Sequence, residues 1–217
     1  MPINGHIVAA LQAEAEGAHD QARAQLERIL EAAPQHVLAN HLLGTIHFHQ
    51  GALDLAIAHY RRALQTRPAF VVCWYDLGVA YYHRGNMPEA ILAYRRCLEV
   101  EPSYNAAHYR LAIALFHAGE LDEALQHFEK CTALTPQYLM ARYHVGIVHE
   151  RLGNWELAAQ AFEQSRADGV GEVSSLFHLA SMRRALGDKE GARELLEQAH
   201  EFARAHALLS ASGAGNA

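Results

Sequence analysis

Between residues 71 and 104, apolar residues recur at the three- and four-residue spacing of an amphipathic helix. The first half of this stretch places Trp74 and Leu77 on one helical side, and the second half does the same around Tyr94. Gly85 separates the halves, and glycine adopts the left-handed conformation of a helix C-cap without strain. The stretch therefore predicts two antiparallel helices, A and then B, that meet through their apolar sides.

The same pattern recurs every 34 residues, counted from glycine to glycine: Gly17, Gly51, Gly85, Gly119, Gly153 and Gly187. Each glycine is followed by an alanine at the fifth residue and by a large apolar residue at the ninth: Leu26, Tyr60, Tyr94, Phe128, Phe162 and Leu196. An Asp or Asn near each glycine predicts the capping or turn residue at which helix B starts: Asp20, Asp54, Asn86, Asp122, Asn154 and Asp188. We number positions from the first residue of each repeat: 3–36, 37–70, 71–104, 105–138, 139–172 and 173–206.

One helix pair alone leaves part of its apolar side uncovered. Burying one Leu or Phe contributes about 1.5–3 kcal/mol, and much of this is gained only when the next pair stacks on the first. We therefore expect a single repeat domain over residues 3–206. The end of the last helix and a disordered tail are expected in 207–217, where the composition is small and polar.

The central repeat resembles the tetratricopeptide repeat family through Trp74, Leu77, Gly78, Tyr81, Ala90, Tyr94 and Pro102, with Tyr94 in place of the usual Phe. The resemblance covers nearly the whole chain. It implies an all-α, right-handed superhelical solenoid of six antiparallel helix pairs, with A helices inside and B helices outside. The later repeats depart from the pattern, because Val170 replaces a closing proline and Arg183 replaces a buried Tyr.

Charge and composition narrow the partner class. A net charge of −6 argues against a nucleic-acid surface, which normally needs a basic stripe. No apolar run is long enough to span a membrane, and the first residues lack the features of a secretory signal. Cys73, Cys97 and Cys131 form no CxxC, which fits a reducing cytosol. Cys97 and Cys131 share one position in successive repeats, and this spacing predicts no disulfide between them. We expect a cytoplasmic protein.

Catalytic patterns are missing from the sequence, so we expect no enzyme activity and no cofactor. There is no phosphate-binding loop and no nucleophile elbow, and Gly153 stands where a zinc protease would need its second histidine. His49, His83 and His117 share one position in three successive repeats. Neighbouring helices lie about 8–10 Å apart, whereas zinc ligands lie about 2 Å from the ion. No metal site is expected, although the sequence leaves metal binding or pH sensing by these histidines open.

Three columns of residues on the A helices predict a partner-binding groove. Rings and aliphatic side chains dominate them in repeats two to four, and repeats five and six add the cationic part, Arg151, Arg184, His144 and His178. The alternative is that these rings only pack between neighbouring helices. In the first interpretation the groove has an apolar part and a cationic part that would bind a carboxylate. The predicted residues are His41, Phe48, His49, Tyr75, Val79, Tyr82, His83, Tyr109, Ile113, Phe116, His117, Tyr143, Ile147, Arg151, Phe177 and Arg184.

The function expected from this groove is that of a non-catalytic adaptor or assembly factor. It would bind a peptide or amphipathic helix of another protein, including one with an acidic or C-terminal carboxylate. The Lys and Asn by which family members bind chaperone tails are absent at positions 5 and 9. Two alternatives remain: a self-assembling scaffold, a homo-oligomer whose repeat ends stack, and a regulatory module of a neighbouring enzyme.

Overall fold

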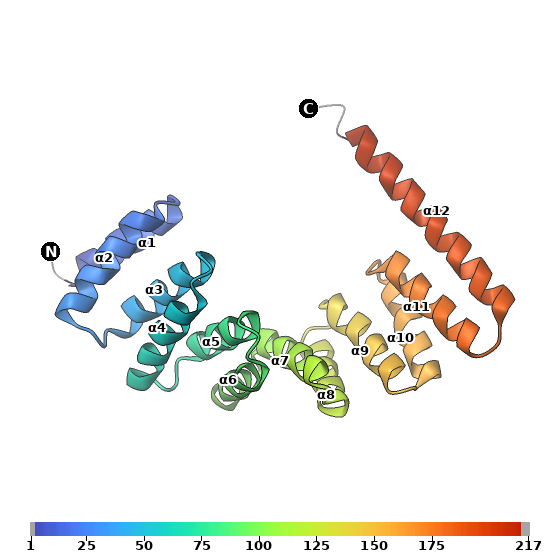
Figure 1. Ribbon diagram of the computed structural model, residues 1–217, viewed down its shortest axis with the longest axis horizontal. Helices are drawn as coiled ribbons and strands as arrows, with labels where there is room; N and C mark the ends of the chain where they lie inside the picture. Colours follow the sequence, from blue (N-terminus) through green and yellow to red (C-terminus); the bar gives the residue numbers. More distant parts are fainter. Residues whose placement is uncertain (1–2, 214–217) are drawn as a thin grey trace. The chain divides into compact units, whose positions relative to one another are not determined.

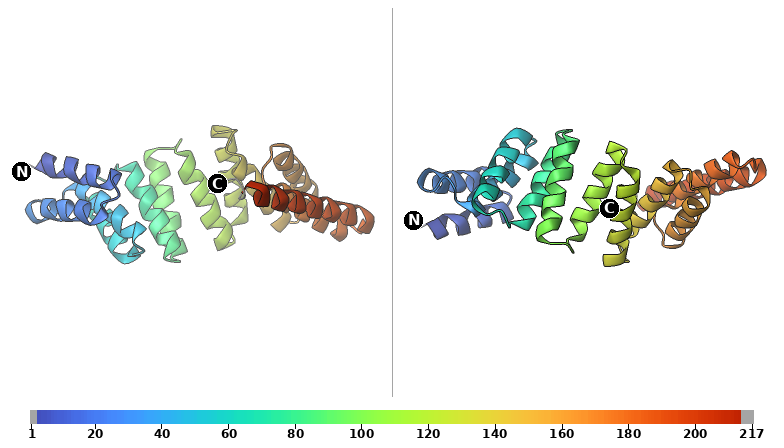
Figure 2. Two further views of the ribbon diagram at one scale, coloured as in Figure 1. Left: turned by 90° about the horizontal axis from the view of Figure 1, so that it is seen from above. Right: turned by 90° about the horizontal axis from the view of Figure 1, so that it is seen from below.

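The protein is described by a computed structural model, which places the backbone of residues 3–213 and the side chains up to residue 204. This part of the chain contains twelve α-helices and no strand, so the all-α repeat fold is confirmed. Within each unit, successive helices form antiparallel pairs, such as α3 with α4 and α9 with α10 (Figures 1 and 2). Their bounds are α1 Ile3–Ala15, α2 His19–Ala32, α3 Val37–His49, α4 Leu53–Thr66, α5 Val71–His83, α6 Met87–Val100, α7 Asn105–Ala118, α8 Leu121–Leu134, α9 Leu139–Arg151, α10 Trp155–Ala167, α11 Glu172–Ala185 and α12 Lys189–Gly213.

The chain divides into two compact units, Met1–Ala118 and Gly119–Ala217. The first unit contains α1 to α7 and the second contains α8 to α12. The division falls in the turn between the two helices of the fourth repeat. The two units are described separately below, and a single solenoid over residues 3–206 stays a prediction.

The repeat glycines end the A helices as predicted. Gly51 has a φ of 75°, and its N–H donates to the carbonyl of Phe48 at 3.0 Å. The N–H of Ala52 then donates to the carbonyl of His47 at 2.9 Å, which completes a Schellman motif. The equivalent glycines of the other repeats also have positive φ angles, which side chains with a Cβ adopt only with strain.

Of the six residues predicted at the start of helix B, three lie in the first turn and three stand at the N-cap. Asp20, Asp54 and Asp122 lie in the first turn of helix B, because the residue that completes the Schellman motif or its neighbour already serves as N-cap. Carboxylates in a first turn still interact favourably with the helix dipole. Asn86 and Asn154 occupy the N-cap position but make no side-chain capping bond. Only Asp188 caps through its carboxylate, which accepts from the N–H of Gly191 at 2.9 Å.

Glycine at position 8 lets an aromatic ring at position 24 lie against the A helix. A Cβ on Gly78 would lie 2.5 Å from Cε1 of Tyr94. The same relation joins Gly44 to Tyr60 and Gly146 to Phe162. Where position 24 is leucine, position 8 is alanine, as in the first and sixth repeats. The match in size between the two positions holds in five of the six repeats, and the fourth departs from it by combining Ala112 with Phe128.

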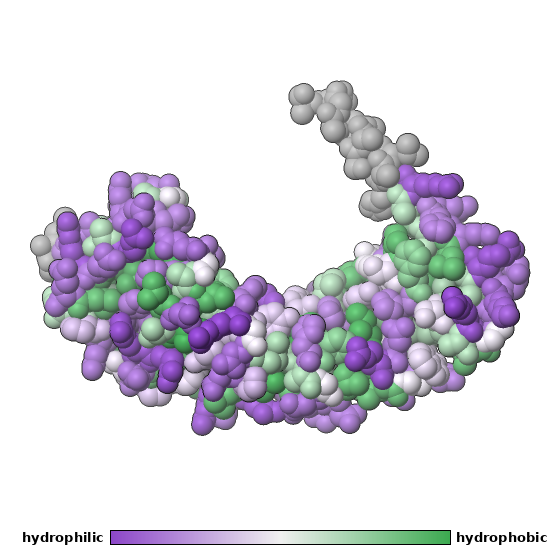
Figure 3. Space-filling view, viewed as in Figure 1, coloured by the Kyte–Doolittle hydropathy of each residue, from purple (hydrophilic) through white to green (hydrophobic). Residues whose placement is uncertain are grey.

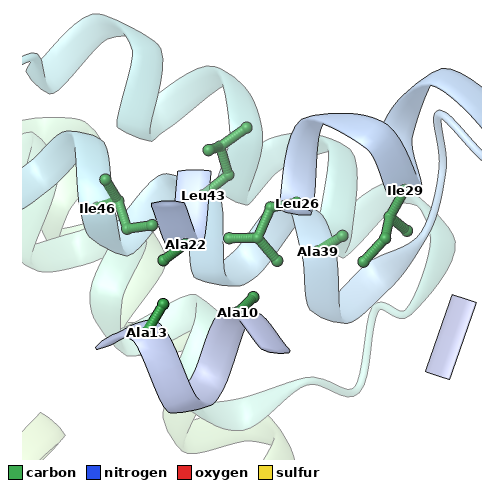
Figure 4. Packing of buried hydrophobic residues seen from close by; sticks show 8 residues of the cluster. All are labelled: Ala10, Ala13, Ala22, Leu26, Ile29, Ala39, Leu43 and Ile46. Atoms are coloured by element: carbon green, nitrogen blue, oxygen red, sulfur yellow. The ribbon is translucent and has the colours of Figure 1, made fainter. Parts of the chain in front are cut away.

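The first pair shows the small-residue version of this core. Ala10 and Ala13 of α1 are buried against Ala22 and Leu26 of α2, and residues of α3 cover the other side (Figure 4). Its A helix lacks the large residues of the central repeat, a composition typical of a degenerate N-terminal cap. Its alanines are nevertheless packed, since small side chains allow the two helices to approach closely.

The residue at position 4 closes the connection between repeats, a role the sequence did not predict. The indole N–H of Trp74 donates to the carbonyl of Pro68 at 2.7 Å. The amide of Asn40 donates to the carbonyl of Pro34 at 2.9 Å, and a ring nitrogen of His108 lies 3.0 Å from the carbonyl of Pro102. Three different donors therefore satisfy the same proline carbonyl six residues earlier.

The last helix extends further than expected. Helix α12 continues to Gly213, so residues 210–213 are helical and not part of a disordered tail. Alanine and serine in this segment permit the helix to continue, because neither residue interrupts the hydrogen bonds of the helix backbone. The remainder of the predicted tail, 214–217, lies outside the described residues.

Candidate functional site

Within the first unit, the A helices form the more closely spaced layer. Helix α3 contacts α5, and α5 contacts α7, in addition to the contacts within each pair. The B helices α4 and α6 pack mainly on their own A helix and on the A helix that follows. Side chains at positions 2, 5, 9, 12 and 13 share one side of an A helix by their three- and four-residue spacing. We call this side of α3, α5 and α7 the A-helix surface.

Aromatic rings and histidines alternate along this surface. The ring of Phe48 lies 5.4 Å from that of His83 in the next repeat, nearly edge to face. Tyr82 and His117 repeat the contact one step further, at 6.0 Å. The two aromatic rings are half-buried, whereas His49, His83 and His117 are exposed. The structure therefore brings together predicted residues from three successive A helices in a continuous row.

The predicted residues at position 5 contribute to packing as well as to the surface. Tyr75 lies 6.1 Å from the buried ring of Tyr94 and 5.5 Å from Tyr104. His41 lies 2.8 Å from a carboxylate oxygen of Asp76 in the next repeat and packs on Phe70. These side chains are half-buried, as are Val79, Tyr109, Ile113 and Phe116. Each retains a solvent-facing portion.

The residues predicted from the sequence did not include position 2, which also contributes to the A-helix surface. Leu38 is 37% exposed and Val72 is 40% exposed, although both are aliphatic. Their signal in the sequence is the apolar residue that recurs at position 2 of the second to fifth repeats: Leu38, Val72, Ala106 and Met140. Together with the half-buried rings, they add exposed apolar area to one end of the A-helix surface.

In the second unit, the predicted residues separate into packed and exposed groups. Tyr143 packs on Phe162 and on His178, and Ile147 borders the same cluster. Phe177, Arg151 and Arg184 are exposed. Two histidines that we had added to the cationic part are engaged in packing: His144 stacks on Phe128, and His178 stacks on Phe162 and pairs with Glu150 at 2.7 Å. The cationic part therefore consists of the two arginines.

Among the described residues, no three His, Cys, Asp or Glu side chains lie close enough together to hold a metal ion. The three cysteines are buried and unbridged, and burial raises the pKa of the Cys97 thiol to about 12. A thiol with so high a pKa is a poor nucleophile at neutral pH.

A histidine pair in the second repeat is sensitive to acid. The rings of His47 and His59 stack at 5.5 Å, and Nδ1 of His59 lies 3.0 Å from the side-chain oxygen of Asn40. Burial, together with the nearby His47 and Arg62, lowers the pKa of His59 to about 4. Burial and Arg23 also lower the pKa of His47. Both imidazoles are therefore neutral in the folded protein at pH 7.

We expect the protein to lose stability between pH 6.5 and pH 4 partly through this pair. The pKa of His59 is lower in the folded protein than in the unfolded chain. Its contribution to stability is therefore fully present above the unfolded pKa, and it is lost as the pH falls because the unfolded chain takes up protons first. His59→Gln should reduce this loss by about 1–2 kcal/mol after allowance for partial exposure. Thermal unfolding of wild type and His59→Gln over a series of pH values measures this difference. His19→Gln, at an exposed site, is the control, and equal pH profiles for wild type and His59→Gln would contradict the prediction.

No helix in the described part of the chain is long and apolar enough to cross a lipid bilayer. No curated protein matches the sequence closely. Solved structures share the fold. The chain aligns with a tetratricopeptide repeat protein from Parabacteroides merdae at a TM-score of 0.76 and 19% identity, over 92% of this chain and 79% of that one.

Two further structures align similarly. The first is MamA, with a TM-score of 0.73 and 24% identity over 76% of this chain and 96% of that one. The second is YrrB, described as a TPR protein with an unusual peptide-binding site, with a TM-score of 0.73 and 18% identity over 87% of this chain and 97% of that one. At these identities the likeness concerns the fold alone.

The family model for the tetratricopeptide repeat matches residues 8–69, 75–138 and 145–207, and a second model of the same description matches 47–96. These segments cover most of the chain and coincide with the helix pairs of both units. The chain belongs to the tetratricopeptide repeat family.

Proposed function

We propose that this protein binds a segment of another protein on the A-helix surface of its first unit. Family members generally act as non-catalytic protein-interaction modules. The observation that supports the A-helix surface is its row of half-buried rings, Phe48 and Tyr82, continued by exposed apolar residues at position 2. Contiguous apolar area on a protein surface marks an interaction site more often than scattered single residues do.

The chemistry of this surface favours an amphipathic partner. Rings and aliphatic side chains provide contact area with little loss of conformational entropy on binding. The charges nearby are few, and Asp76 is already paired with His41. The partner would therefore place apolar side chains on the rings, and its polar side chains would meet the exposed histidines along the edge. An amphipathic helix or an extended peptide with apolar residues on one side has this arrangement.

The second unit would contribute a separate contact through Arg151 and Arg184. Both guanidinium groups are exposed and lie at the ends of successive A helices, α9 and α11. Arginine binds carboxylates in a bidentate geometry, so an acidic side chain or a C-terminal carboxylate is the ligand that these residues suit. The adaptor or assembly role, and a cytoplasmic location, belong to this proposal.

The test compares exposed apolar residues on the two kinds of helix. Leu38→Glu with Val72→Glu places charges on the A-helix surface, whereas Leu92→Glu with Val100→Glu places them on a B helix at similar exposure. We expect the first pair to weaken partner binding by more than about tenfold and the second pair to leave it unchanged. Affinity purification followed by calorimetry with the captured segment measures both.

Position 2 is preferable to position 5 for this experiment, because Tyr75 also packs on Tyr94 and its loss would disturb the fold. Full binding by Leu38→Glu with Val72→Glu would place the site elsewhere. In the same assay, Arg151→Glu with Arg184→Glu tests the second contact, and unchanged affinity for an acidic ligand would remove it from the proposal.

A further inference from the structure

Successive repeats contact each other through two positions. In three places, the residue at position 6 of an A helix lies against the residue at position 24 of the preceding pair or the cluster around it. The imidazole of His144 stacks on Phe128 at 5.2 Å, and that of His178 stacks on Phe162 at 4.6 Å. In the first unit, Leu42 packs against the cluster that contains Leu26.

The two positions match in character along the chain. Where position 24 is aromatic, the next position 6 is polar or imidazole. Where position 24 is leucine, the next position 6 is leucine. The five pairs are Leu26 with Leu42, Tyr60 with Asp76, Tyr94 with Arg110, Phe128 with His144, and Phe162 with His178.

Position 24 of the last repeat and position 6 of the first repeat lack a partner of this type within the described chain. Leu196 stands at position 24 of the last repeat and is 37% exposed, whereas its counterparts in the other repeats are buried. Val8 stands at position 6 of the first repeat and is 63% exposed. Both are aliphatic, so Leu196 and Val8 match in the same way as Leu26 and Leu42 do. They lie in different units, and no contact between them within one chain is implied.

The surface around Leu196 resembles the surface that the next A helix covers between internal repeats. Phe177, 44% exposed, and Arg184 line a cavity of about 490 Å³ with Leu196. Figure 3 shows a hydrophobic patch where α11 and α12 lie together. Between internal repeats, the A helix of the following pair occupies the equivalent place, as α3 does on α1 and α2.

Charges at the ends of the two helices are also complementary. Neighbouring A helices run parallel and in register, as the contacts of His41 with Asp76 and of Phe48 with His83 show. The last turn of α11 carries Arg184, which has no ion-pair partner among the residues described. The last turn and end of α1 carry Glu14 and Glu16. A parallel arrangement of α1 beside α11 would bring these opposite charges to the same end.

We propose that α1 of a second copy packs on α11 and α12 and continues the repeat contact between molecules. Val8 then lies between Phe177 and Leu196, and Arg184 lies near Glu16. The two surfaces in this contact differ, so it is heterologous, and each bound copy leaves one surface of each kind exposed. Association therefore grows with concentration beyond a dimer. The proposal does not depend on partner binding at the A-helix surface.

The test blocks one surface at a time in the full chain. Val8→Glu blocks the first-repeat surface and Phe177→Glu blocks the last-repeat surface, and both sites are exposed enough to tolerate the change. In sedimentation velocity over a concentration series, wild type should form growing oligomers and each variant alone should be monomeric. A mixture of the two variants should form a dimer and nothing larger, because only one complementary pair of surfaces remains. Leu55→Glu, on an exposed part of α4, is the control and should behave as wild type.

A charge exchange checks the register independently. Arg184→Glu should weaken association by more than about tenfold, and Glu16→Arg in the same chain should restore it. A wild-type protein that is monomeric throughout the series would overturn the proposal. So would a mixture of Val8→Glu and Phe177→Glu that stays monomeric while both variants keep the wild-type circular dichroism spectrum and melting temperature.

Discussion

Gly78→Ala is expected to lower the free energy of unfolding by about 1–3 kcal/mol, although alanine favours helix over glycine by about 1 kcal/mol. The added Cβ would lie 2.5 Å from the ring of Tyr94, which is fully buried, so the ring or the helix must shift to accommodate it. Steric overlap in a packed core outweighs the gain in helix propensity. Chemical denaturation of wild type and variant measures the difference.

The same size match provides a rescue for that variant. Tyr94→Leu combined with Gly78→Ala recreates the alanine–leucine pair found in the sixth repeat, Ala180 and Leu196. The double variant should lose less stability than the two single changes added together. Tyr94→Phe is the control, because it keeps the ring and removes a buried hydroxyl that has no hydrogen-bond partner in the described residues. Additive losses would show that the two positions do not interact.

Phe162→Ala is expected to have the larger effect, about 3–5 kcal/mol. The ring is fully buried, packs on Tyr143 at 5.6 Å and stacks on His178 of the next pair. Gly146 lies directly beneath it, so no neighbouring side chain can fill the cavity from that side. The change therefore removes a contact within one pair and a contact between two pairs.

The loss should be confined largely to the second unit. In repeat proteins each pair contacts only its neighbours, so stability is close to a sum of local terms. Hydrogen exchange with mass spectrometry should show faster exchange in α9 to α12, with α3 to α5 protected as in wild type. Phe202→Ala, at an exposed site on α12, is the matched control for loss of a phenylalanine. Equal loss of protection in α3 to α5 would contradict local unfolding.

Several features of the A-helix surface followed from the sequence only in part. The apolar columns identified the side of each A helix correctly, since residues three and four apart share a side in any α-helix. They did not separate rings that pack from rings that are exposed. Tyr75 and Tyr143 support the core, whereas Phe177 at the same position is exposed because no following A helix of the described chain covers it.

The sequence by itself determined the helix pairs, their glycine C-caps and the buried positions. These depend on local backbone geometry and on apolar periodicity, and six copies of one pattern make both unambiguous. Gly51 and Gly85 illustrate it, because only glycine adopts their positive φ angles without strain.

The tertiary structure alone decided which side chains meet across repeats. His144 and His178 were expected at a cationic surface, yet they stack on the rings of Phe128 and Phe162. A helical period gives the direction of a side chain but not the distance to the neighbouring pair. That distance depends on the sizes of side chains that meet only after the pairs have stacked, such as Phe162 and His178, which are 16 residues apart in the sequence.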